Sequence, residues 1–331
     1  MLRNVLLAAA LSLAAPLAAA PLEVLPSGHP IAHVTLDGSK PLRFVIDTAA
    51  TSTSVLPRLR AAMPGSMKVA GSQSLNGAAG QTQIQTLTLG QLAVDGRTFK
   101  GLEAFALPPS PVDALGVDGV LGTDVIARYV VEMDIPGRSW RMVDRTTPEM
   151  LRGMHAPVPI TLDEGLTPLL SVTIDGVAIP AVLDTGAKGT IINWAAARLL
   201  GVTLATRGLK RASALKGVTS QAMPSVVHKL EALEIGDARW LNFNVRIADL
   251  PVFHVLGFEN GAPAMILGID ALADRRFIID HPKRSLHIAP VEEAGGRKVQ
   301  HYPSLHGADA RRTKRFVSTP KLRPDLGSKR L

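Results

Sequence analysis

The sequence predicts an all-β protein built from two similar lobes, and three observations support this fold class. Short apolar or alternating runs recur between Gly, Asn, Asp and Pro residues, which is the pattern of strands joined by turns. Long helical periodicity is confined to Ala195–Leu200 and little else. Matching blocks of sequence occur twice in the same order, which indicates a duplicated unit. With 331 residues, the chain is long enough for both units to bury a core.

The repeat consists of four pairs of matching blocks. In the central pair, Phe44–Ala50 and Ala181–Ala187, an apolar strand runs into a turn that begins with Asp-Thr. The other pairs are Pro30–Gly38 with Pro168–Gly176, Val120–Asp124 with Ile266–Asp270, and Asp134–Trp140 with Asp280–Leu286. Each lobe therefore carries one acidic turn, and we expect a pseudo-twofold axis to relate the two lobes.

Lobe one, residues 21–145, is expected to begin with strands at Leu22–Gly38 and Pro41–Asp47, the second of which ends at the acidic turn. The small residues of Gly71–Gly80, followed by the alternating Gln81–Leu89, suit the tip of a mobile hairpin. The other expected elements are a β-branched strand at Thr51–Pro57, strands through Val94 and Phe105, a Pro-rich loop at Pro108–Pro111, strands at Val120–Gly122, Val131–Asp134 and Trp140–Val143, and a short helix from Asp124 to about Tyr129.

Residues 146–159, which include three prolines, are expected to link the lobes. Lobe two, residues 160–290, repeats the plan, with its acidic turn at Asp184 and a small-residue hairpin at Ala212–Ser220. Its other expected elements are a strand at Thr190–Trp194, a helix at Ala195–Leu200, a strand at Met265–Gly268, a helix near Asp270–Asp274 and a final hairpin at Phe277–Ile288.

The first 20 residues have the order of an export signal. Arg3 precedes an apolar run from Val5 to Ala15 and a stretch of small residues. The run is short for a membrane span, which needs roughly 20 residues, so we expect residues 1–20 to be a signal peptide and the protein to be exported, periplasmic or secreted. No later stretch could span a bilayer after removal of the signal. The absence of Cys excludes disulfides, thiolate chemistry and Cys-based zinc sites.

The net charge of +8 is concentrated near the C-terminus. Residues 291–331 contain ten Lys and Arg against four Asp and Glu, which leaves the rest of the chain close to neutral. We expect this Gly-, Pro- and Ser-containing segment to be a basic, disordered tail. No basic groove interleaved with aromatic residues is visible, so nucleic acid is not an expected partner.

Asp47 and Asp184 occupy equivalent places in the repeat, and two carboxyl groups brought face to face cannot both ionise cheaply. They would share one proton, so that an acid and a base coexist at one site. Such a pair can activate a water and protonate a leaving amine, which hydrolyses an amide without a metal or a covalent intermediate. The Thr after each Asp can tie the two turns together through its hydroxyl, and the small residue after the Thr leaves room for main-chain amides to approach the carboxylates.

An Asp-Thr-Gly-Ala turn after an apolar strand, then a Gly-rich hairpin and an apolar strand ending in Gly before a helix, resembles the retroviral-type aspartic proteases, the retropepsin-like group. The resemblance covers about Pro30–Val143 and Pro168–Ile288. It implies that each lobe is a small closed β-barrel with a short helix, and that one chain forms an intramolecular pseudo-dimer as a monomer. It also implies an aspartic endopeptidase that acts on peptide or protein substrates and uses no metal or cofactor.

The resemblance assigns roles to the matching residues, with Asp47 and Asp184 as the catalytic pair. The residues expected to support the pair are Thr48, Ala49, Thr185, Gly186, Gly122 and Gly268, and those expected in substrate-binding flaps are Asn76, Gly77, Gly80 and Gly217. The main departure is Ala49, because the family motif has Gly at this position. The absence of a flap Tyr and of disulfides separates the chain from the pepsins.

Two other classes of function compete with a protease. A catalytically impaired pseudoprotease would bind extended peptides between the lobes, with the pair spoiled by Ala49. A structural or interaction protein would have little reason to keep both Asp residues, because a buried carboxylate pair is costly. Zinc hydrolysis is disfavoured because the His residues lack a ligand spacing such as His-Glu-x-x-His. Serine catalysis is disfavoured because Gly71–Leu75 lacks the closing Gly of a nucleophile elbow.

Overall fold

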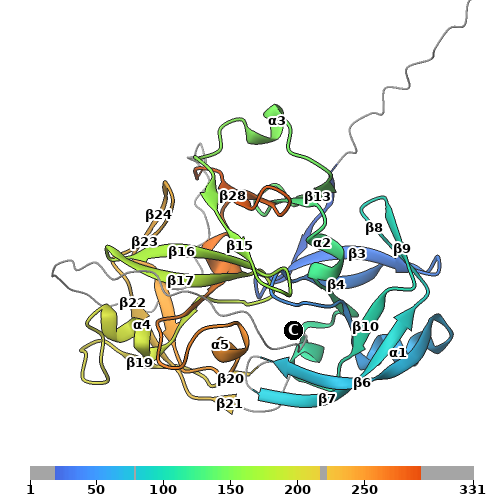
Figure 1. Ribbon diagram of the computed structural model, residues 1–331, viewed down its shortest axis with the longest axis horizontal. Helices are drawn as coiled ribbons and strands as arrows, with labels where there is room; N and C mark the ends of the chain where they lie inside the picture. The colour runs from blue at the N-terminus through green and yellow to red at the C-terminus, as the bar shows by residue number, and fades with distance from the viewer. Residues whose placement is uncertain (1–18, 78–79, 217–221, 292–331) are drawn as a thin grey trace, which may run out of the picture.

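The structure is a computed structural model that describes residues 19–77, 80–216 and 222–291. Strands make up most of its regular secondary structure (Figure 1). The longest α-helices in this part of the chain, α1 (Pro57–Ala62) and α4 (Trp194–Leu199), have six residues each. The predicted all-β class is therefore confirmed. The signal and the basic tail predicted from the sequence lie outside the described residues, apart from the few residues at their inner ends.

Two sheets with the same strand order form the body of the molecule (Figure 1). The first contains, from edge to edge, β6 (Met67–Gly77), β7 (Gly80–Leu89), β10 (Glu103–Ala106), β5 (Ser54–Val55), β11 (Gly119–Leu121), β4 (Leu42–Ile46), β3 (Pro30–Leu36), β8 (Gln91–Val94) and β9 (Arg97–Lys100), with β2 (Glu23–Val24) paired to β3. Each sheet curls into a half-barrel rather than a fully closed barrel, and the two similar sheets are consistent with a duplicated retropepsin-like fold.

The second sheet follows the first strand for strand. It contains β19 (Lys210–Arg211), β22 (Val226–Lys229), β25 (Asn244–Ile247), β18 (Ile191–Ile192), β26 (Met265–Gly268), β17 (Val177–Asp184), β16 (Pro168–Ile174), β23 (Ala232–Ile235) and β24 (Ala238–Leu241), with β15 (Thr161–Leu162) paired to β16. The short central strands β5, β11, β18 and β26 are buried along their whole length.

A third sheet joins the two halves and lies above them in Figure 1. Its strands are β1 (Ala20–Pro21), β13 (Ser139–Val143), β12 (Val130–Asp134), β27 (Arg276–Asp280), β28 (Ser285–Ile288) and β14 (Val158–Pro159), in that order. The centre of this sheet is the antiparallel pair β12 and β27, one strand from each half. Trp140 and Phe277 are fully buried beneath it, so the halves share one continuous core. The segment expected to be a linker contains α3 (Pro148–Leu151) as well as β14.

Several local elements differ from the sequence expectation. The strand expected over Thr51–Pro57 is only the two-residue β5, because Pro57 starts α1, where its fixed φ favours a helix. The expected helices after Gly122 and Gly268 are short, namely α2 (Thr123–Ile126) and the 3₁₀ turn η3 (Ile269–Ala271). Helix α5 (Val252–Val255) was not anticipated, because four residues are too few to show a helical period. Two more 3₁₀ turns occur, η1 (Pro64–Ser66) and η2 (Pro111–Leu115).

No helix in the described ranges is both long and apolar enough to cross a membrane.

Candidate active site

The two acidic turns meet because each follows a strand at the centre of its half-barrel. Asp184 is the last residue of β17, which runs parallel to β26, and its register partner is Gly268. In the first half β4 runs parallel to β11, and the N–H of Asp47 donates to the carbonyl of Leu121 at 3.1 Å. The three residues before each Asp are apolar and buried, so the strands deliver the two carboxylates to the boundary between the halves.

Thr48 and Thr185 bind the two turns to each other through four hydrogen bonds. The N–H of each Thr donates to the Oγ1 of the other, at 3.2 Å for Thr48 and 3.1 Å for Thr185. Each hydroxyl then donates across the boundary at 2.7 Å, Thr48 to the carbonyl of Leu183 and Thr185 to that of Ile46. Both Thr side chains are fully buried, so water cannot replace these bonds. The sequence reasoning that the Thr hydroxyls tie the turns together matches this geometry.

The carboxyl groups of Asp47 and Asp184 hydrogen-bond to each other. Asp47 Oδ1 accepts from the N–H groups of Ala49 (2.9 Å) and Ala50 (3.0 Å), and Asp184 Oδ1 accepts from Ala187 (2.8 Å). Asp47 and Asp184 are each half-buried as whole residues, so the pair lies within reach of solvent.

Burial raises the pKa of both carboxyl groups, because a charge is poorly solvated between the halves. The negative charge of Asp47 raises the pKa of Asp184 further, well above its ordinary value. The main-chain donors partly oppose this effect at both residues. The pair therefore favours a state with one shared proton over a state with two charges.

Gly186 and Ala49 follow the two Thr residues but differ in the space around them. A Cβ atom added to Gly186 would overlap the carboxylate of Asp47. Ala49 is 6% exposed and its methyl group belongs to an apolar cluster of the second half that includes Val182 and Ile266. Ala49 does not adopt a positive φ, so its backbone carries no strain of that kind. Ala49 therefore fits into this turn without a left-handed backbone.

We predict that Ala49→Gly changes the turnover of a good peptide substrate by less than about tenfold, a barrier difference under roughly 1.4 kcal/mol. The reason is that the N–H of residue 49 already reaches Asp47 without a positive φ. Initial-rate kinetics on both proteins would measure the change. An inactive natural protein that gains activity through Ala49→Gly would contradict this account.

Gly122 and Gly268, two of the residues expected to support the pair, lie close against the main chain of the two turns. A Cβ at Gly122 would lie 2.7 Å from the carbonyl oxygen of Ala50, and one at Gly268 would lie 2.6 Å from the carbonyl carbon of Gly189. A larger residue at either position would displace the main chain of the neighbouring turn. The supporting positions are therefore brought together, and their part in catalysis belongs to the proposal below.

A second pair of acids, Asp124 and Asp270, binds the residues that follow the two turns. These two acids received no role in the sequence analysis. The N–H and hydroxyl of Thr53 donate to Asp124 at 2.9 Å, and those of Thr190 donate to Asp270 at 3.0 and 2.7 Å. Burial raises the pKa of Asp270 to about 6. The signal was present, because both acids stand in matching blocks of the repeat.

The expected flap residues of the first half lie in a long hairpin, and the hairpin of the second half is much shorter. In the first half, Asn76 and Gly77 end β6 and Gly80 begins β7, and Gly77 pairs with Gly80. Leu75 of this hairpin is fully buried in an apolar cluster that includes Ala50 of the first turn. In the second half the hairpin is the short pair β20 (Leu215–Lys216) and β21 (Ala222–Met223). Gly217 lies outside the described residues.

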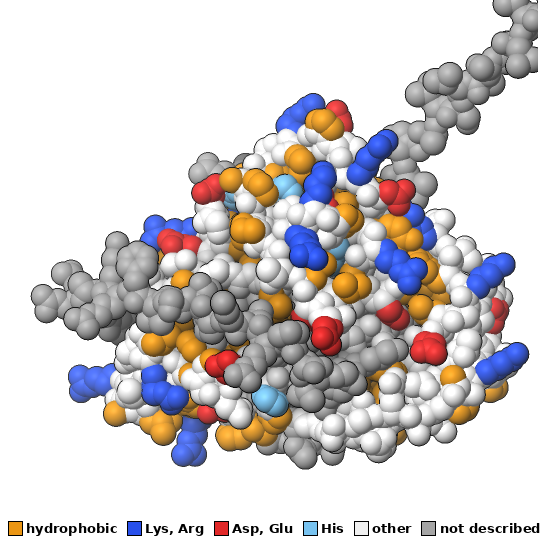
Figure 2. All heavy atoms as spheres, in the orientation of Figure 1, with side chains coloured by type: hydrophobic (Ala, Val, Ile, Leu, Met, Phe, Trp, Pro, Cys, Tyr) orange, Lys and Arg blue, Asp and Glu red, His pale blue; other side chains and the backbone are white. Residues whose placement is uncertain are grey.

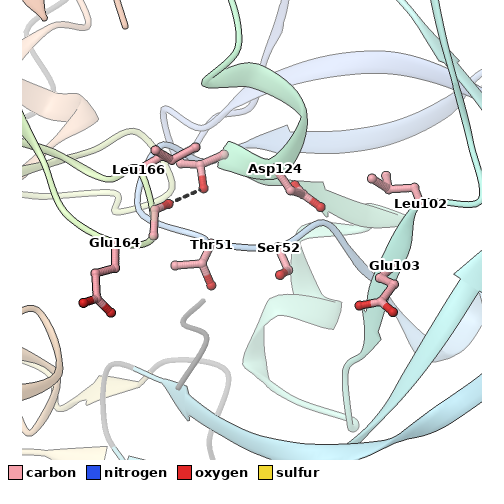
Figure 3. Close-up of a pocket in the computed structure, with 9 residues that line it drawn as sticks. Thr51, Ser52, Leu102, Glu103, Asp124, Glu164 and Leu166 are labelled. Atoms are coloured by element: carbon pink, nitrogen blue, oxygen red, sulfur yellow. Dashed lines mark hydrogen bonds between the residues drawn. The ribbon is translucent and has the colours of Figure 1, made fainter. Parts of the chain in front are cut away.

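A pocket of about 320 Å³ lies between residues of the first half and the segment that precedes β16 of the second half, beside the turn that follows Asp47 (Figure 3). Thr51 and Ser52 of the turn, Glu103 and Asp124 line it together with Glu164. The dashed bond in the figure joins the hydroxyl of Thr123 to the carbonyl of Gly165 at 2.7 Å. Within the described ranges, no group of three or more acidic or His side chains is placed to hold a metal ion.

His29 is the functional candidate that sequence reasoning missed. It is buried, 8% exposed, and hydrogen-bonds to the main chain of Gly186 in the second turn. A lone His before Pro30 gives no signal of this contact, because the two residues are far apart in the sequence.

The family model described as "Aspartyl protease" matches residues 32–125 and again residues 170–271, together more than half of the 331 residues. Each match contains one of the two acidic turns. No curated protein matches the chain in sequence.

Proposed function

Because the chain belongs to the aspartyl protease family, we propose that it is an aspartic endopeptidase that hydrolyses peptide bonds with a water activated by Asp47 and Asp184. The observation that carries this proposal is the hydrogen bond between the two carboxyl groups at the meeting point of two locked turns. A structural protein would gain nothing from this arrangement, because burying two acids side by side costs stability.

The geometry supports a general acid–base reaction. The ionised member of the pair takes a proton from the water, which attacks the carbonyl carbon of the peptide. The protonated member donates to the carbonyl oxygen, which gives a tetrahedral diol. The proton taken from the water then passes to the leaving nitrogen as the C–N bond breaks, and a hydroxyl of the diol gives its proton to the other carboxylate, so that the pair again holds one proton. The main-chain donors on Asp47 and Asp184 hold both carboxyls in place throughout. No covalent intermediate is required.

The proposed substrate is a peptide or an unfolded segment of a protein, bound between the halves. The two acids come from one chain, so we propose a monomer that acts as an intramolecular pseudo-dimer. On the face drawn in Figure 2, Lys and Arg side chains are spread over both halves rather than gathered in one groove. This distribution gives no support to nucleic acid as a partner. From the character of residues 1–20 we propose that the protein is exported, periplasmic or secreted.

The pH dependence tests the shared-proton mechanism. The active pair holds one proton, so activity is lost as pH falls through the lower pKa of the pair and as it rises through the upper one. Because burial and the charge of Asp47 raise the pKa of Asp184, the upper limit should lie above the pKa of an isolated carboxyl group. We expect a bell-shaped profile of kcat/KM for an unstructured peptide, unaffected by a chelator.

Two outcomes would contradict this function. Loss of hydrolysis in a chelator would indicate a metal enzyme. Tight binding of extended peptides without hydrolysis at any pH would favour the alternative, a catalytically impaired pseudoprotease of the same fold.

A further inference from the structure

His29 lies in the short segment between β2 and β3 of the first half, and this segment packs against the second half. Its ring Nδ1 is 2.7 Å from the hydroxyl of Ser27. A Cβ at Gly28 would lie 3.5 Å from Cγ2 of Ile269, and the N–H of Ile269 donates to the carbonyl of Ala187 at 2.9 Å. The segment is therefore packed beside the turn that carries Asp184, independently of any contact made by the ring.

The ring completes this contact through its hydrogen bond with the main chain of Gly186. This bond favours the protonated ring, as expected when an imidazole N–H donates to a carbonyl oxygen. Burial lowers the pKa of His29, and the charge of Lys188 lowers it further. An uncharged ring satisfies both partners, because one nitrogen donates to Gly186 while the other accepts from Ser27.

The carbonyl of Gly186 and the N–H of Ala187 belong to the same peptide group. That N–H donates to Asp184 Oδ1 at 2.8 Å. A donor on the carbonyl polarises the peptide and strengthens its N–H as a donor. The contacts thus form one chain from Ser27 through His29 and the 186–187 peptide to the carboxylate.

The first turn has no equivalent of this chain among the described residues. The position equivalent to His29 is Thr167, since Pro30 and Pro168 match in the repeat. Thr167 is fully buried and its hydroxyl has no hydrogen-bond partner in the described part of the protein. The imidazole therefore acts on one carboxylate of the pair.

We propose that His29 is a positioning residue for the catalytic pair, which holds the 186–187 peptide so that its N–H stays on Asp184. The inference deepens the proposed function and rests on it for its role in catalysis. The structural link itself exists whether or not the protein cleaves peptides.

The test is a titration of the Asp carboxyl carbons by NMR in the full chain, using ¹³C-labelled aspartate. His29→Leu fills the space but cannot donate, so the Ala187 N–H should bind Asp184 less well and the upper pKa of the pair should rise. His29→Gln keeps an N–H donor without an ionisable ring and should restore the wild-type titration. Thr167→Val removes the equivalent hydroxyl and should leave it unchanged. With a cleavable peptide, His29→Leu should lower kcat roughly tenfold or more and change KM little.

Identical titrations of wild type and His29→Leu would overturn the inference. So would a shift of equal size in His29→Gln, which would mean that the ring acts by charge rather than by holding the peptide. If His29→Leu does not fold, Ser27→Ala frees the ring and should move the titration in the same direction, and no movement would equally overturn it. A wild-type protein that cleaves nothing would remove the proposed function, while the titration still decides the structural link.

Discussion

Asp184→Asn should abolish peptide hydrolysis, with kcat/KM lower by about a thousandfold or more, and Asp47→Asn should do the same. Asn keeps an oxygen for the main-chain donors on each residue, so the turns should stay folded. The loss would then come from chemistry, since one carboxyl group cannot supply both the acid and the base. Initial rates on one peptide substrate would measure both variants.

A matched control for these variants is Asp144→Asn. Asp144 is an exposed acid, 79% accessible in its side chain, that pairs with Arg97 on the surface. Exposed pairs of this kind contribute little to stability, so the variant should keep wild-type activity. Near-full activity in either Asp47→Asn or Asp184→Asn would show that the two acids do not form one catalytic pair.

Gly186→Ala is expected to have the second largest effect, lowering kcat about a hundredfold or more. The new methyl group would overlap the Asp47 carboxylate, which must rotate away from Asp184 to make room. The protein should still fold, because the strain is relieved by moving one short side chain. The reverse change at the equivalent position of the other turn, Ala49→Gly, is the control, since position 49 already accommodates a methyl group.

Thermal unfolding of both variants would separate a local effect from misfolding. Wild-type turnover by a folded Gly186→Ala variant would mean that the two carboxylates have more freedom than the structure shows. A fall in turnover for Ala49→Gly as large as that for Gly186→Ala would mean that the two turns do not differ as described.

The duplicated fold and the acidic pair could be predicted from the sequence because their signals are local and repeated. The Asp-Thr turns, the Gly residues beneath them and the alternating strands all recur at matching positions. Asp47 and Asp184 occupy the same place in the repeated block, so the two acids are equivalent. A shared site then follows once the two lobes pair. The identical strand order of the two sheets follows from the same duplication.

Features that depend on contacts between distant segments could not be predicted. The sheet that joins the halves pairs β12 with β27, strands that each read as the last part of one lobe. Short strands such as β1 and β14 have two residues and no readable period. His29 reads as an ordinary His beside Pro30, and only the folded chain brings it to Gly186.

The most direct test of the central claim is a titration of the active site with a tight-binding statine-type inhibitor, followed by residual hydrolysis of a peptide. If Asp47 and Asp184 of one chain form one shared-proton site, activity should reach zero at one inhibitor per chain. An end point of one inhibitor per two chains would mean that the site is shared between chains, and full activity in excess inhibitor would contradict an aspartic mechanism.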